Sequence, residues 1–161
     1  NPLYEIIGLL DALLINESEV KLLAKEPNLV KASRLILKQG PSILVVKRGS
    51  AGLIGFTSSD IFVIPAYPID EVMDPTGAGD TFAGGFLGFL SAIGTLSKES
   101  LRQAMVIGSV MASFTVETFG LDRLDSLTDK DIRERYESFQ EMTTFDTNAE
   151  LKVPSRKQLN K

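Results

Sequence analysis

One short segment of the chain combines a flexible, glycine-containing backbone with carboxylates. It spans residues 74–80 and reads DPTGAGD. Gly77 and Gly79 allow a tight turn that brings backbone N–H groups close to a ligand. An apolar helix is expected to begin here, so the positive end of its dipole faces the same spot. The segment therefore predicts an anion hole, formed by Gly77, Ala78 and Gly79, that suits a phosphate or developing negative charge.

Asp80 falls in the first turn of this predicted helix, beside the anion hole. A carboxylate so close to bound phosphates has a chemical purpose if it accepts the proton of an attacking hydroxyl group. The alternative interpretation is structural: Asp80 complements the helix N-terminus, and the glycines only make a tight turn. The segment is not a Walker A loop, because it lacks the G-x-x-x-x-G-K pattern. It is not a dinucleotide-binding fingerprint either, because Phe82 occupies the position of the third glycine.

The composition restricts the chemistry that the sequence can perform. Its 161 residues include no cysteine and no histidine. Disulfides, thiolate metal sites, a Ser-His-Asp triad and a histidine base are therefore excluded within it. Acid–base chemistry has to come from carboxylates, lysine, tyrosine or bound water. With 43% hydrophobic and 24% charged residues, the composition is that of an ordinary globular domain.

Charge and hydropathy limit the partners. The formal net charge is −4 and no broad basic segment is present, which argues against nucleic acid as a partner. No apolar run reaches the roughly 18 residues of a membrane helix, and no signal peptide is visible. We therefore expect no membrane partner and a cytoplasmic location. Because the sequence starts at Asn1, we also expect it to be a fragment or a processed product.

Alternating strands and helices are expected to position these residues. Apolar runs predict strands at residues 11–15, 42–47, 53–57 and 61–64, the last two as a hairpin-like pair. Periodicity and capping residues predict helices at residues 16–25, 28–40, 77–93, 98–118 and 128–142, with a last strand after Thr143. The glycine-rich helix would pack closely on a sheet through its small residues Ala83, Gly84, Gly85 and Gly88. This alternation is typical of an α/β fold with a mostly parallel sheet.

Residues 74–85 resemble the D-T-x-G-A-G-D signature, and the helix that follows it, of the ribokinase or PfkB family of carbohydrate and nucleoside kinases. Asp74 matches the first aspartate, residues 77–79 the anion hole and Asp80 the catalytic base of that family. Pro75 replaces the usual threonine. The resemblance implies that Asp80 and the N–H groups of residues 77–79 are the catalytic groups.

Two further motifs occur in the order of the family. Residues 16–19, NESE, resemble its N-x-x-E motif, which implies that Asn16 and Glu19 help to organise Mg²⁺ and phosphate through water. The same two residues also fit a helix capping box, and that alternative stays open. A K/T-x-G-x-x-G turn, which lies along the nucleotide in the family, is matched by Lys47, Arg48, Gly49, Ser50, Ala51 and Gly52. The alternative is an ordinary turn with a solvated Lys-Arg pair.

The resemblance also implies two sites that carry no motif of their own. The wall beside the adenine base of ATP corresponds to Ala104, Ile107, Gly108 and Met111. From the residue pattern alone, these four form only an apolar helix face. A monovalent-cation site, for K⁺, corresponds to backbone carbonyls near Asp74, Thr76, Thr115 and Gly120.

Together the motifs predict that residues 1–161 are the ATP-binding, catalytic C-terminal half of a ribokinase-like three-layer α/β/α kinase domain. The half that carries the substrate-binding residues and lid in the family is missing. The implied reaction is Mg²⁺-dependent transfer of the γ-phosphoryl of ATP to a sugar or nucleoside hydroxyl, with the fragment alone inactive. The alternatives are a phosphosugar or vitamin alcohol as acceptor, and a non-catalytic nucleotide-binding module. An unpaired sheet edge also predicts a homo-oligomer.

Overall fold

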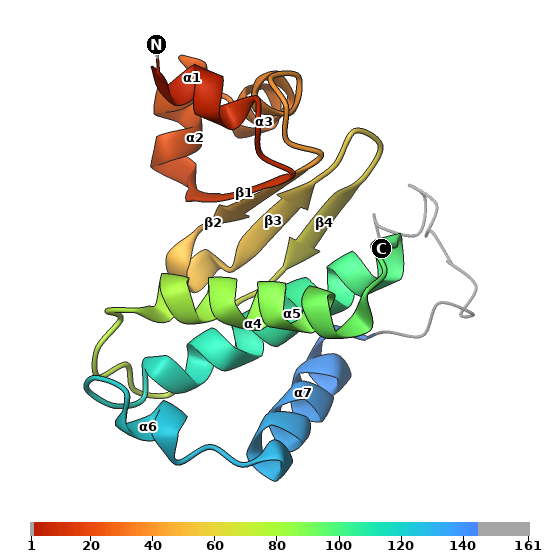
Figure 1. Ribbon diagram of the computed structural model, residues 1–161. Helices are drawn as coiled ribbons and strands as arrows, with labels where there is room; N and C mark the ends of the chain where they lie inside the picture. The colour runs from red at the N-terminus through yellow and green to blue at the C-terminus, as the bar shows by residue number, and fades with distance from the viewer. Residues whose placement is uncertain (1, 145–161) are drawn as a thin grey trace, which may run out of the picture.

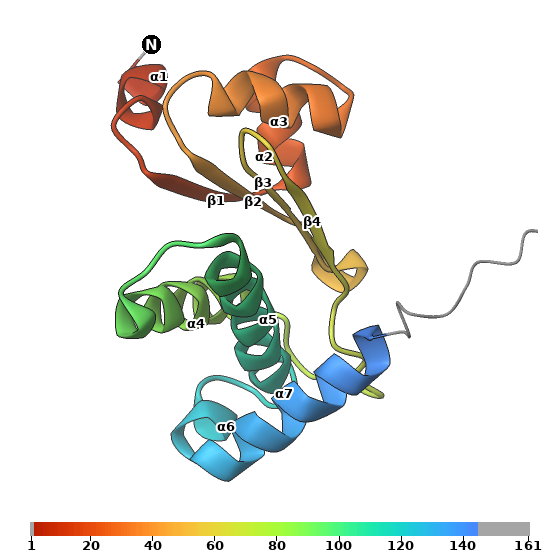
Figure 2. The same cartoon turned by 90° about the vertical axis from the view of Figure 1, so that its right-hand side faces the viewer.

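The computed structural model describes residues 2–144, which form three layers (Figure 1). The middle layer is a sheet of the strands β1 (Ala12–Asn16), β2 (Ile43–Lys47), β3 (Leu53–Phe56) and β4 (Ile61–Ile64). One face of the sheet carries α1 (Pro2–Ile7), α2 (Glu17–Ala24) and α3 (Leu29–Leu37). The other face carries α4 (Ala78–Ile93) and α5 (Lys98–Thr115), with α6 (Asp122–Asp125) and α7 (Asp129–Thr143) beyond them (Figure 2). This is the α/β fold that the sequence predicts.

The sheet itself differs from the prediction of mostly parallel strands. Its order is β1-β2-β3-β4, with β1 and β2 parallel but the pairs β2–β3 and β3–β4 antiparallel. The described sheet is therefore mixed. The connections explain the difference, because α2 and α3 cross over between β1 and β2, whereas residues 48–52 and 57–60 are too few for a crossover.

Most predicted elements are found within about three residues of their expected bounds. The sequence interpretation missed α1 and α6, whereas the turn that it predicted at residues 48–52 is present as a 3₁₀ turn at Gly49–Ala51. The last strand, expected after Thr143, falls largely on residues outside the described part. Among the described helices, none is both long enough and apolar enough to cross a membrane.

Apolar side chains fill the space on both sides of the sheet. The cluster beneath α2 and α3 contains Val20, Ala32, Ile36, Leu44, Val46 and Phe56. The larger cluster, toward α4 and α5, includes Val45, Phe62, Phe82, Phe86, Met105 and Phe114. Strand β2 contributes alternate residues to the two clusters. This explains why its sequence is a continuous apolar run rather than an alternating one.

Helices α4 and α5 approach each other closely where Gly85 faces Gly108. A Cβ on Gly85 would lie 3.2 Å from Gly108 Cα, and a Cβ on Gly108 would lie 2.8 Å from both the ring and the carbonyl oxygen of Phe82. The prediction that the small residues of α4 pack on a sheet is therefore corrected: the close partner is α5. Gly84 and Gly88 are exposed and face open space.

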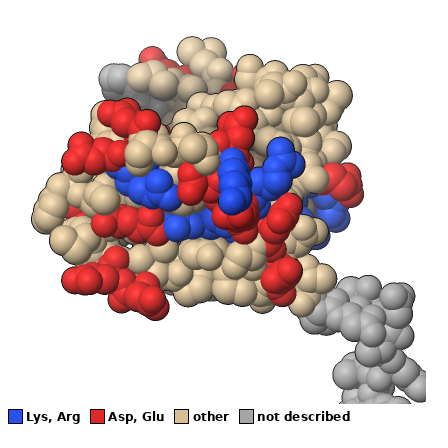
Figure 3. Space-filling view, turned by 90° about the horizontal axis from the view of Figure 1, so that it is seen from below, with Lys and Arg blue, Asp and Glu red and all other residues tan. Residues whose placement is uncertain are grey.

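Charges of both signs are interleaved on the face of α6 and α7 that Figure 3 shows. Arg123 lies 3.5 Å from Glu117 and 3.4 Å from Asp131, and Arg135 lies 2.6 Å from Glu117. The basic side chains in this group are thus neutralised by nearby carboxylates.

Gly108→Ala is expected to destabilise the chain, because the added methyl group would overlap the backbone carbonyl of Phe82. Overpacking costs about 1–3 kcal/mol, of which the better helix propensity of alanine offsets up to about 1 kcal/mol. Gly84→Ala is the matched control and should stabilise by about 0.5–1 kcal/mol, because that glycine is helical and faces open space. Urea unfolding measures both variants, and equal effects would contradict the close contact between the helices.

Candidate active site

The motifs meet at one end of the sheet. Asn16, the last residue of β1, pairs with Lys47 at the end of β2, and Lys47 pairs with Leu53 at the start of β3. The carboxyl ends of the two parallel strands therefore coincide, which is where α/β sheets commonly bind ligands. The N-terminus of α4 lies against this same end, because Gly79 contacts Lys47.

A cavity of about 710 Å³ opens here. The last residue of β2, Lys47, lines it together with Gly49, Ser50 and Gly52 of the following turn and with Ala78 and Gly79 of α4. Of the described residues that line the cavity, Lys47 alone carries a charge. A cavity with one cation at one end and neutral walls elsewhere suits a ligand with an anionic end and an uncharged body.

Lys47 places its ammonium group directly over Gly79. A Cβ on Gly79 would lie 2.8 Å from Lys47 Nζ, so only glycine leaves room for this approach. Within residues 2–144, no carboxylate lies within 4.0 Å of the Lys47 ammonium. A cation beside the positive end of a helix is electrostatically unfavourable unless an anion lies between them. The arrangement therefore favours binding of an anion.

The N-terminus of α4 offers hydrogen-bond donors at the same place. Ala78 donates its N–H to Pro75 O at 3.3 Å, and Asp80 donates to Gly77 O at 3.0 Å. The N–H groups of Gly77 and Gly79 donate to no group in the part of the chain that the structure describes. Two free N–H groups at the start of a 16-residue helix are the donors of a candidate anion site, and Ala78, which the sequence analysis included, is not one of them.

Arg48 and Ala51 do not line this cavity, unlike the other residues of the predicted nucleotide turn. They line a separate shallow pocket with Glu17, Ser18 and Lys21. Glu17 Oε1 accepts from Lys21 Nζ at 2.6 Å, and Glu17 Oε2 accepts from Arg48 Nε at 2.7 Å. Hydrogen bonds from Lys21 and then Arg48 hold the pKa of Glu17 below its ordinary value. Arg48 is therefore already paired, which leaves Lys47 as the cation of the cavity.

Helix α5 forms a wall of the cavity, but not with the face that the resemblance implies. The cavity-lining residues at and just beyond this helix are Ser109, Ala112, Ser113 and Val116. The residues of the predicted adenine wall do not line this cavity; they are Ala104, Ile107, Gly108 and Met111. Gly108 and Met111 contact Gly85 of α4 instead, and Ala104 is buried in the core. The face of α5 that lines the cavity could have been found in the sequence, because its four residues are mostly small and follow the helical spacing i, i+3, i+4, i+7.

Asn16 and Glu19 form the capping box that the sequence left as the alternative interpretation. Asn16 Oδ1 accepts the N–H of Glu19 at 2.9 Å, and Glu19 Oε2 accepts the N–H of Asn16 at 2.8 Å. Both residues are exposed, and Glu19 Oε1 makes no hydrogen bond within the described part of the chain. The described residues contain no cluster of three or more acidic side chains that could hold a metal ion by themselves.

The residues of the implied monovalent-cation site are brought together in part. Met73 and Asp74 donate their N–H groups to Val116 O at 2.8 and 3.4 Å, which ties this loop to the end of α5 beside Thr115. Thr115 donates its hydroxyl to Thr81 Oγ1 at 2.9 Å. Hydrogen bonds from the hydroxyl and N–H of Thr76 hold the pKa of Asp74 below its ordinary value. Gly120 lies in an exposed turn with a φ of 65°, and no hydrogen bond ties it to this group.

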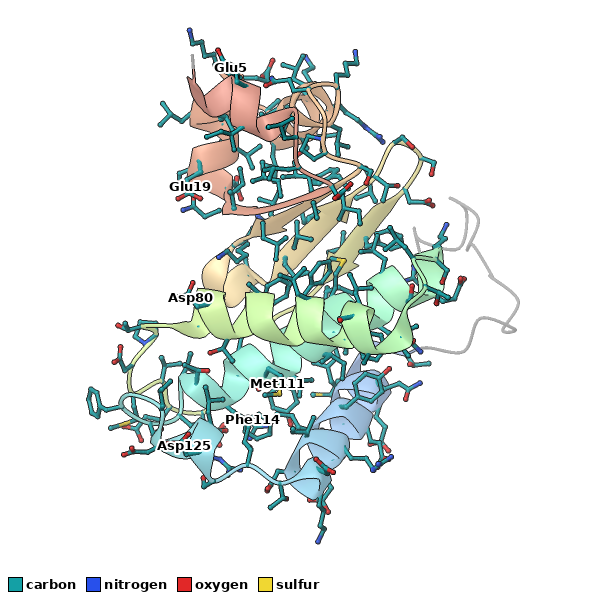
Figure 4. All side chains as sticks on the ribbon, viewed as in Figure 1. Glu5, Glu19, Asp80, Met111, Phe114 and Asp125 are labelled. Atoms are coloured by element: carbon teal, nitrogen blue, oxygen red, sulfur yellow. The ribbon has the colours of Figure 1, made fainter. Side chains whose placement is uncertain are left out.

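Asp80 lies on the exposed first turn of α4, adjacent to the cavity-lining Gly79 but outside the cavity. Figure 4 shows it on the same side of the molecule as Glu19. A carboxylate at the rim of an anion site can meet a second reactant that arrives from solvent. The chain thus places a cation, two free N–H groups and a carboxylate within the first residues of one helix and the strand end beside it.

Comparisons with known proteins identify the class of protein. Residues 2–127 match the model of the pfkB family of carbohydrate kinases, and the chain belongs to this family. A ribokinase of Lactococcus lactis is 35% identical over 116 residues, which cover 72% of this chain and 35% of that protein. A cytidine kinase of Thermococcus kodakarensis is 36% identical over 87 residues, which cover 53% of this chain and 31% of that protein.

Solved structures agree on the fold. The nucleoside kinase of Methanocaldococcus jannaschii has a TM-score of 0.68 at 29% identity, with 84% of this chain and 42% of that one covered. The aminoimidazole riboside kinase of Salmonella enterica, solved with aminoimidazole riboside and an ATP analog, has a TM-score of 0.73 at 23% identity, with 84% and 46% covered. The ribokinase-like fold is therefore confirmed. The chain spans 31–46% of the length of these four relatives.

Gly79→Ala is expected to weaken ADP binding about tenfold, the usual contribution of a hydrogen bond to a charged group. The new methyl group would displace the Lys47 ammonium, which is the end of a flexible side chain, so stability should not fall. Gly84→Ala, farther along the same helix and exposed, is the control. Calorimetric titration with ADP tests this, and an unchanged affinity in the Gly79 variant would contradict the placement of the anion site.

Proposed function

We propose that this chain is the ATP-binding, catalytic part of a kinase that transfers the γ-phosphoryl group of ATP to a hydroxyl group of a sugar or nucleoside. The observation that carries the proposal is the ammonium of Lys47 over Gly79, at a helix start with free N–H groups and Asp80 in its first turn. The family supports a kinase, and its relatives include ribokinase, cytidine kinase and fructokinase.

In this proposal the nucleotide lies along the cavity. The phosphates meet Lys47 and the N–H groups of Gly77 and Gly79, because these are the positive groups of the site. The base lies at the neutral end, against Tyr67 and the small residues Ser109 and Ala112. A wall of small residues beside an aromatic ring leaves room for a flat, uncharged base.

Asp80 would accept the proton of the acceptor hydroxyl as its oxygen attacks the γ-phosphorus. The bond from the γ-phosphorus to its bridging oxygen breaks, and ADP leaves with that oxygen. Lys47 and the free N–H groups would stabilise the negative charge on the transferring phosphoryl group. Asp80 lies in solvent at the cavity rim, so the acceptor can approach from outside the nucleotide cavity.

The described residues offer few ligands for a magnesium ion. When bound with ATP, it would neutralise part of the charge of the phosphates. Glu19 would contribute its Oε1 atom through water, because its other oxygen and the amide oxygen of Asn16 are used in the capping box. The proposal also includes a K⁺ site near Asp74 and Thr115, supported by the hydrogen bonds that bring the loop of residues 73–74 to the end of α5.

The acceptor alcohol is proposed only as a class. The relatives carry different names, from ribokinase to inositol 3-kinase, and this chain spans less than half of each. We propose that the residues that select the acceptor, and any lid, lie in the part of the relatives' length that these 161 residues do not cover.

Asp80→Asn in the full-length kinase should lower kcat by about 10²–10⁴, the usual contribution of a positioned general base. The substitution keeps the size of the side chain but removes the proton acceptor. ADP affinity should change little, because Asp80 lies outside the cavity. Steady-state kinetics and calorimetry test this together. An unchanged kcat would contradict the role of Asp80 as the base, and a loss of ADP binding would assign Asp80 a structural role.

The 161-residue chain by itself is expected to bind ADP and to phosphorylate no acceptor. The cavity is formed by its own residues, whereas acceptor positioning, the main contribution of a phosphoryl-transfer enzyme, is not. The assay uses ribose, fructose, adenosine and related alcohols with light scattering to record the oligomeric state. Turnover of one of them at about 1–100 per second, the ordinary range of kinases, would contradict the proposal.

A further inference from the structure

Helix α7 lies beyond the residues that match the family model, yet it packs beside the proposed nucleotide cavity. The match ends at residue 127, and α7 begins at Asp129. Figure 2 shows α7 crossing one end of α5, the helix that supplies one wall of the cavity. The side chain that connects the two is Arg135, which is mostly buried.

Arg135 makes three contacts with α5 and the residues just after it. Its Nη1 donates to Ser113 Oγ at 3.0 Å, and its Nη2 donates to Glu117 Oε1 at 2.6 Å. Its guanidinium carbon lies 3.6 Å from the ring centroid of Phe114. Ser113 lines the cavity. One planar side chain thus fixes a cavity-wall hydroxyl, a carboxylate and an aromatic ring at once.

The Ser113 hydroxyl has little freedom left. It donates to Val110 O at 2.6 Å and accepts from Arg135, so both its hydrogen and one of its lone pairs are used. Without Arg135, the hydroxyl would keep only its bond to Val110 O, and its position in the cavity lining would be less well fixed. Glu117 neutralises the arginine, so the guanidinium group adds no net charge to the wall.

A second residue of the cavity lining, Tyr67, also depends on α7. The centroid of the Tyr67 ring lies 5.1 Å from the guanidinium carbon of Arg135. The same ring stacks on Phe139 of α7, with centroids 6.1 Å apart, and its hydroxyl lies 3.3 Å from Ser138 Oγ. Tyr67 and Ser113 therefore share Arg135 as a common support. Both are uncharged residues of the cavity lining, whereas Lys47 is the charged one.

We propose that Arg135 is a positioning residue for the nucleobase: it touches no ligand but holds Ser113 and Tyr67 in the geometry that receives the base. The inference rests on the proposed nucleotide site. It assigns a role in nucleotide recognition to a helix that the family match does not include. Loss of Arg135 is expected to weaken binding of the base without affecting binding of the phosphates.

The test compares two probes in the full-length kinase. ADP reports on both ends of the cavity, and tripolyphosphate reports on the phosphate end alone. Arg135→Gln should weaken ADP binding about tenfold, as for one lost hydrogen bond of a charged donor, and change tripolyphosphate affinity less than twofold. Arg135→Lys keeps the charge beside Glu117 but cannot reproduce the fork, so it should show the same pattern to a smaller extent. If the Arg135→Gln variant does not fold, the Arg135→Lys variant is used for the comparison instead.

Two controls make the outcome specific. Arg133→Gln alters an exposed arginine on the same helix and should leave both affinities unchanged. Ser113→Ala should weaken ADP binding less when Arg135 is already lysine, because the arginine acts through this hydroxyl. Unchanged ADP affinity, or an equal loss for both probes, would overturn the inference. Failure of the unmodified kinase to bind ADP would instead overturn the proposed function.

Discussion

The N-terminus of α4 has to lie at the carboxyl end of β2, and the close packing of α4 on α5 holds it there. Gly85 and Gly108 let the two helices approach until Phe82 fills the space between them. Phe82 and Phe86 then join the core that lies under the sheet. Because α4 is anchored in this way, its first turn cannot move away from Lys47, and the positive groups stay together. The geometry of the proposed active site thus depends on a contact between two helices, made by residues that are far apart in the sequence, rather than on the glycine loop alone.

The charge distribution of the cavity follows from which cations have partners. Lys21 and Arg48 share Glu17, while Arg123 and Arg135 share Glu117. Lys47 has no such partner among the described residues, although it is adjacent in sequence to the paired Arg48. An unpaired ammonium beside free helix N–H groups stabilises a bound anion more than it stabilises the empty fold. This contrast between neighbouring residues separates the anion site from the ordinary charged surface.

Much of the fold could be predicted because its signals are local. Asn16 and Thr128 begin helices with capping boxes that the next few residues complete. The apolar run of β2 indicates a strand buried on both faces, which the two core clusters confirm. The hairpin of β3 and β4 was predicted and is confirmed, but the antiparallel pairing of β2 with β3 was not predicted, since it depends on the length of the connection and not on the strands themselves. The short α1 and α6 carry too few residues for a periodic signal.

The sequence by itself determined the motifs, their order and hence the family, because glycines and carboxylates at set spacings are local features of the chain. Only the tertiary structure decided which side chains share a cavity. It separated Lys47, the last residue of β2, from Arg48, the first residue of the turn, because the two successive side chains point into different pockets. It also placed Ser109 and Ser113, rather than Gly108 and Met111, on the cavity wall. The physical reason is that one step along a helix rotates a side chain by about 100°, so the face toward a ligand depends on how neighbouring elements pack.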